Sequence, residues 1–103
     1  MTCVVIEGFV VPEGLTPRAT TLLLRLPAGF PDSPPDMFWC DPPLRLSNGS
    51  YPRAAENMEP YLNRIWQRFS RHLASGSWRP GQDNLRTWLA IVRRALQDAA
   101  AGN

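Results

Sequence analysis

The sequence contains no lysine, and all eleven of its basic residues are arginine. Nine acidic residues bring the formal net charge to +2, so the strong positive charge typical of nucleic-acid binders is missing. Genome composition is one explanation for the absence of lysine. The functional alternative is that a protein handling an amine-reactive intermediate gains from having no side-chain amines.

Cysteine and histidine are also scarce. Cys3 and Cys40 are the two thiols, and His72 is the one imidazole. Two cysteines suit a reduced cytoplasmic protein better than a disulfide-stabilised scaffold. Two thiols do not make a metal site and a single histidine adds little, so we predict no bound metal.

Long apolar runs are missing too, since no stretch approaches the roughly 18 residues that a transmembrane helix needs. The sequence also lacks the pattern of a signal peptide, and we therefore predict a cytoplasmic protein that binds neither membrane nor nucleic acid. A chain of 103 residues with 44% hydrophobic residues is expected to form one domain, residues 1–103, around one modest core.

Three strands are predicted in the first half of the chain. Residues 3–11 are rich in β-branched side chains and are interrupted at Gly8, which suggests a β-bulge. Residues 19–26 follow after a short turn, so antiparallel pairing is expected. The proline-rich residues 27–35 exclude a helix, and residues 37–40 then read as a third strand.

The chain after this meander is harder to interpret. Asn48-Gly49 indicates a tight turn. Residues 53–59, between Pro52 and Pro60, have the composition of a short helix.

A C-terminal helix is the best-defined element. Its apolar stripe follows the spacing i, i+3, i+4, i+7 and i+11, in Leu85, Trp88, Leu89, Val92 and Leu96. Asp83 is a suitable N-cap after Pro80-Gly81. We predict a helix over residues 83–97 with Trp88 buried, followed by a frayed tail at residues 98–103.

Two motifs resemble the ubiquitin-conjugating fold. Residues 26–38, LPAGFPDSPPDMF, are similar to the Tyr/Phe-Pro-x-x-Pro-Pro turn that leads into the third meander strand of that fold. Trp78-Arg79-Pro80 before a helix is similar to its Trp-x-Pro motif, and Ser70 lies eight residues earlier, where the family has its catalytic residue. The runs PPDMFW, WQRFSRH and WRPG are most similar to the bacterial group called prokaryotic family E, over residues 4–97.

The resemblance implies an α+β fold, an antiparallel meander with a C-terminal helix packed on it. It also implies a conjugating enzyme, a transferase that accepts the C-terminal glycyl group of a ubiquitin-like protein from an activating enzyme and passes it to a target. No cofactor is implied, because adenylation belongs to the activating enzyme. The chain departs from the family in lacking the nucleophilic Cys, the His-Pro-Asn motif and the N-terminal helix, and in its long separation between Pro35 and Ser70.

Residues 62–73 allow two interpretations. Helical spacing of apolar residues favours a helix, whereas the position in the family favours extended chain. In extended chain Ser70 and His72 point to the same side, so that His72 is close enough to act as a base. In a helix, residues i and i+2 do not face each other.

The candidate site is therefore Ser70 as acceptor, His72 as base, and Arg68 or Arg71 as stabilisers of an oxyanion. A Ser and His that merely hydrogen-bond a loop explain the same residues. Cys40 is the better nucleophile by chemistry, but it follows an apolar strand and is expected to be structural. Two other functions remain open: a non-catalytic module that binds or scaffolds a ubiquitin-like protein, and a hydrolase using Ser70 and His72, which no Gly-x-Ser-x-Gly motif supports.

Overall fold

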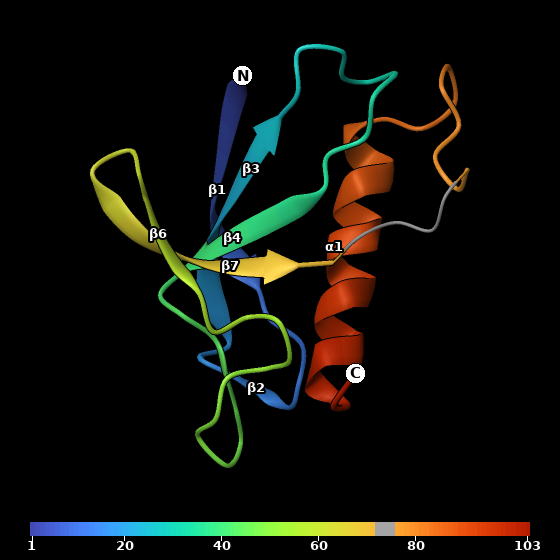
Figure 1. Cartoon of the computed structure of the whole chain (residues 1–103). Coiled ribbons are helices and arrows are strands. Elements are labelled where there is room, and N and C mark those ends of the chain that lie inside the picture. Colours follow the sequence, from blue (N-terminus) through green and yellow to red (C-terminus); the bar gives the residue numbers. More distant parts are fainter. Residues whose placement is uncertain (72–75) are drawn as a thin grey trace.

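The computed structural model describes residues 1–71 and 76–103, and Figure 1 labels its elements except β5. In chain order they are β1 (Thr2–Val10), β2 (Leu15–Thr16), β3 (Ala19–Leu26), β4 (Met37–Asp41), β5 (Arg45–Leu46), β6 (Met58–Tyr61), β7 (Arg64–Ser70) and α1 (Leu85–Ala100). Strands precede the helix, as the α+β class requires.

The main sheet has five strands in the order β1-β3-β4-β7-β6, and every neighbouring pair is antiparallel. β2 and β5 form a separate two-stranded sheet. The predicted antiparallel meander of β1, β3 and β4 is confirmed. The predicted interruption at Gly8 is also confirmed, because the β1–β3 register shifts between Ile6 and Phe9. Gly8 there adopts a φ of 66°, a left-handed conformation that glycine accepts without steric cost.

Helix α1 lies along one side of the sheet (Figure 1) and contributes five of the buried residues of the main core, Trp88, Val92, Ala95, Leu96 and Ala99. Trp88, Val92 and Leu96 are buried against the sheet, while Leu85 and Leu89 pack at the margin of the core and are partly buried. The predicted stripe is thus the face that packs. Among the described residues, no helix is long and apolar enough to cross a bilayer.

The ends of α1 differ from the prediction. Asn84 is the N-cap, since its side chain accepts a hydrogen bond from the Thr87 N–H and the Thr87 hydroxyl accepts one from the Asn84 N–H. Asp83 is used instead by the preceding turn, where its carboxylate accepts the Arg79 N–H at 2.7 Å. The helix continues to Ala100, so it includes the first residues of the expected tail, and Ala99 is only 1% exposed.

The opposite side of the sheet carries a second, smaller cluster. Leu23, Trp39 and Trp66 are its buried members, and Met37 and Tyr61 pack against it. Successive residues of a strand point to opposite faces, so this cluster and the core under α1 come from alternating positions of the same strands. We call the side of the sheet defined by Leu23, Trp39 and Trp66 the second face.

The short helix predicted at residues 53–59 is wrong. The segment turns and then enters β6, and its backbone is hydrogen-bonded to β7: the Arg68 N–H donates to the Asn57 carbonyl at 2.9 Å and the Ser70 N–H to the Ala54 carbonyl at 3.2 Å. Pairing with a neighbouring strand has overridden the local helical propensity. The alternatives for residues 62–73 resolve in favour of extended chain as far as Ser70, where β7 ends.

Candidate functional site

Ser70 is the last residue of β7, and its cross-strand partner in β4 is Met37. Its side chain is half-buried. Because strand residues i and i+2 share a face, Ser70 lies on the second face together with Trp66 and Arg68. β7 is extended as far as Ser70.

His72 falls at residues 72–75, outside the part of the chain that the structure describes. Its predicted role as the base beside Ser70 therefore stays a prediction.

Arg68 reaches toward β6 rather than toward Ser70. Its Nη1 forms an ion pair with the Glu59 Oε2 at 2.8 Å, and both side chains are about a quarter exposed, at 26% each. Partial burial strengthens such a pair relative to one in open solvent. The positive charge of Arg68 is accordingly balanced by Glu59 in this arrangement.

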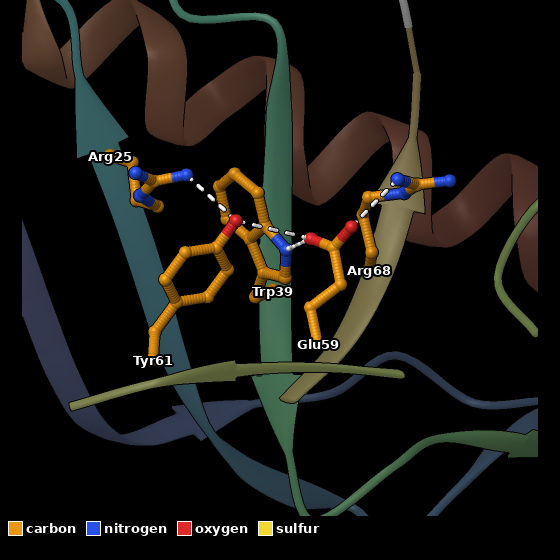
Figure 2. A network of polar contacts seen from close by, with 5 residues as sticks. All are labelled: Arg25, Trp39, Glu59, Tyr61 and Arg68. Carbon is orange, nitrogen blue, oxygen red and sulfur yellow. Dashed lines mark hydrogen bonds and ion pairs between the residues drawn. The ribbon is translucent and has the colours of Figure 1, made fainter. Parts of the chain in front are cut away.

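Glu59 joins a larger network on the second face (Figure 2). Its Oε1 accepts hydrogen bonds from the Trp39 indole N–H at 2.8 Å and from the Tyr61 hydroxyl at 3.4 Å. The Tyr61 oxygen in turn accepts from the Arg25 Nη1 at 2.8 Å. Side chains from β3, β4, β6 and β7 thus form one polar chain from Arg25 to Arg68.

Sequence analysis missed this network. Glu59 and Tyr61, two polar residues separated by Pro60, could have indicated it, because residues two positions apart share a face in extended chain. Interpreting residues 53–59 as a helix concealed that pattern.

Arg71 lies apart from Arg68. Its Nη1 donates to the main-chain carbonyls of Arg53 at 2.7 Å and of Ser70 at 3.2 Å, and its Cζ lies 5.7 Å from the ring centre of Phe69, a residue of the core under α1. Burial lowers the pKa of Arg71, and the positive charge of Arg53 lowers it further, while Asp98 opposes the shift. The structure therefore does not bring the two candidate arginines together beside the Ser70 hydroxyl.

Cys40 is fully buried under α1, at 0% exposure. Burial raises the pKa of the Cys40 thiol, so it stays protonated and is a poor nucleophile. Cys3 is exposed on β1, and its cross-strand partner is Arg25. Within residues 1–71 and 76–103, no group of three or more His, Cys, Asp or Glu side chains has an arrangement suited to a metal ion.

The two motifs that carry the family resemblance are in contact. Trp78 lies against Phe30, with ring centres 6.3 Å apart, and its indole N–H donates to the Pro31 carbonyl at 2.9 Å. Trp78 also meets Trp88 of α1 edge to face, with ring centres 6.5 Å apart. The proline-rich turn, the Trp-Arg-Pro motif and the C-terminal helix thus pack as one unit.

Comparison with known proteins agrees with this arrangement. The model of the family described as prokaryotic E2 family E matches residues 1–99. No chain among the curated proteins or the solved structures matches significantly. The meander, the packed C-terminal helix and a match over nearly the whole length together identify the chain as a member of the prokaryotic E2 family E, which connects it with ubiquitin-like conjugation.

Proposed function

We propose that the protein is a carrier in a ubiquitin-like modification pathway. It accepts the C-terminal glycyl group of a ubiquitin-like protein from an activating enzyme and passes it to an amine or hydroxyl of a target. Family membership over residues 1–99 supports the general role. The observation that carries the choice of acceptor is the position of Ser70, half-buried at the end of β7 and eight residues before Trp78, while Cys40 is buried.

In the proposed step the Ser70 Oγ attacks the carbonyl carbon of the glycyl thioester held by the activating enzyme. A C–O bond forms, the C–S bond breaks, and the hydroxyl proton passes to the leaving thiolate. His72 is the proposed base, because a serine hydroxyl is a weak nucleophile without one. Arg68 and Arg71 are the proposed stabilisers of the oxyanion; for this role Arg68 has to be shared with Glu59, and Arg71 has to turn away from the Arg53 carbonyl.

The absence of lysine sharpens the test of this chemistry. A glycyl group attached to a side chain of this protein cannot form the isopeptide bond that lysine would give. Side-chain attachment must then be an ester on a hydroxyl or a thioester on a thiol. Hydroxylamine cleaves both bonds, whereas a thiol reductant cleaves only the thioester.

The experiment is to express the tagged protein in the organism that encodes it and to purify it under denaturing conditions. A slower-migrating adduct that is lost in Ser70→Ala and kept in Ser47→Ala supports the proposal; Ser47 is the matched control because it is an exposed serine of a turn. An adduct that persists in Ser70→Ala contradicts Ser70 as acceptor.

A non-catalytic binding module is the second candidate, and one observation favours it. The β6–β7 hairpin exposes large apolar side chains, with Ile65 59%, Leu62 53% and Met58 37% exposed. Exposed apolar side chains grouped on one element are typical of protein-binding surfaces. If no adduct forms on the wild-type chain, while Ile65→Asp abolishes capture of a ubiquitin-like protein from the same cells, this function replaces the carrier.

A further inference from the structure

A pocket of about 300 Å³ lies on the second face, beside the polar network of Figure 2. Its lining includes Pro27, Pro34 and Pro35 and the aromatic residues Trp39 and Tyr61. Its volume is at the lower end of the range for small-ligand sites, which are typically apolar with a few convergent polar groups. The described residues around it have that composition.

Two arginines, Arg25 and Arg68, line this pocket, and each has a buried Nε without a hydrogen-bond partner, but only Arg68 is paired with a carboxylate among the described residues. The guanidinium of Arg25 is held in place by a hydrogen bond to the Tyr61 hydroxyl at 2.8 Å and lies 4.1 Å from the Tyr61 ring centre and 5.6 Å from that of Trp39. Stacking on aromatic rings partly compensates a cation for lost hydration. Its Nε is nevertheless buried without a hydrogen-bond partner, and no carboxylate within the described ranges forms an ion pair with Arg25.

The other charges of the pocket are already engaged. Glu59 accepts three hydrogen bonds, from Trp39, Tyr61 and Arg68, and its charge is balanced by Arg68. Asp36 also borders the pocket and has an interaction of its own. Arg25 is thus a fixed cation without an acidic partner among the described residues, next to an apolar cavity.

We propose that this pocket binds a carboxylate carried on a small planar or apolar body. The carboxylate pairs with the guanidinium of Arg25, whose planar fork matches two oxygens, and the body lies against Trp39 and the three prolines. A phosphate fits less well, because its second negative charge would have no cation to pair with: Arg68, the other arginine of the pocket, is already paired with Glu59. This inference does not depend on acyl transfer at Ser70.

The test uses the full chain and a matched pair of probes, 3-phenylpropionate and its amide, followed through the indole N–H signal of Trp39 in NMR. The signal is assigned by its loss in Trp39→Phe. We expect saturable binding of the acid and at least about tenfold weaker binding of the neutral amide, because a charge-assisted hydrogen bond is lost. Peptides ending in phenylalanine with a free or an amidated C-terminus distinguish a free small acid from a chain-terminal carboxylate as the source.

Arg25→Gln should weaken binding of the acid at least about tenfold. Arg45→Gln is the matched control, because Arg45 also stacks on a tyrosine, at 4.2 Å from the Tyr51 ring centre, and donates to its hydroxyl at 2.8 Å, but is not among the residues that line the pocket. Equal shifts with acid and amide on the wild-type chain overturn the proposal without any variant. An unchanged affinity of the folded Arg25→Gln variant for 3-phenylpropionate also overturns the proposal.

Discussion

The indole N–H of Trp78 donates a hydrogen bond to the carbonyl oxygen of Pro31, 47 positions earlier in the chain. The bond joins the proline-rich turn to the segment that follows Ser70. Trp78 also touches Trp88 of α1, so one side chain contacts both the proline-rich turn and the C-terminal helix.

Trp78→Phe keeps an aromatic ring but removes the donor, which leaves the Pro31 carbonyl without this partner. We expect the free energy of unfolding to fall by about 1–3 kcal/mol. Denaturant unfolding measures it. A variant as stable as the wild type would show that the hydrogen bond between turn and motif contributes nothing.

Gln67 is a polar residue that is fully buried, at 0% exposure. Its side chain accepts the Leu44 N–H at 2.7 Å and donates to the carbonyls of Leu44 and Ala55, each at 2.9 Å. Gln67→Leu leaves three buried main-chain groups unsatisfied, and we expect a loss of roughly 3 kcal/mol. The exposed Gln97→Leu should change stability little, and similar losses in both variants would argue against a specific role for Gln67.

β7 illustrates why part of the site could not be predicted. Trp66 and Phe69 are both buried, but on opposite faces of the sheet, because each face is covered. A strand covered on both sides loses the alternation of apolar and polar residues that identifies strands, and its apolar residues then also fit a helical period. The family position was the better guide here.

Composition and periodicity predicted two elements well, although one of them, β3, is covered on both faces, with Leu23 on the second face and Leu22 and Leu24 in the core under α1. The strand at Ala19–Leu26 has the bounds that its composition predicted, and α1 buries most of its stripe. The choice of cap was not predictable, since Asp83 and Asn84 both offer a side-chain oxygen. Asn84 is the cap because the carboxylate of Asp83 is already engaged in the preceding turn, where it accepts the Arg79 N–H.

In the core under α1, the loss of stability on truncating a leucine should depend on how deeply that leucine is buried. Leu96 is 0% exposed and Leu89 is only partly buried. Leu96→Ala should cost about 2–5 kcal/mol through lost transfer energy and the cavity left behind, and Leu89→Ala clearly less. Denaturant unfolding of both variants measures the difference, and the reverse order would contradict the packing of this helix.

Cys40 makes stability depend on pH. Burial raises its pKa in the folded state, so above about pH 8.5 the unfolded chain loses the proton while the folded chain keeps it. Stability conferred by this group is complete below the unfolded pKa and falls as pH rises, by up to about 1.4 kcal/mol per pH unit. Cys40→Ala should remove this component and Cys3→Ala should not. An unchanged pH slope in Cys40→Ala would mean that Cys40 ionises in the folded protein.

The identity of the acceptor is tested most directly by replacing the hydroxyl oxygen of Ser70 with sulfur. In Ser70→Cys a carrier would form a thioester in place of the oxyester, at the same position. Purified from the organism that encodes it, the wild-type adduct should withstand a thiol reductant and be cleaved by hydroxylamine, and the Ser70→Cys adduct should be cleaved by both. A wild-type adduct that the reductant already removes, and that disappears in Cys3→Ala, would contradict the account and place the acceptor on β1.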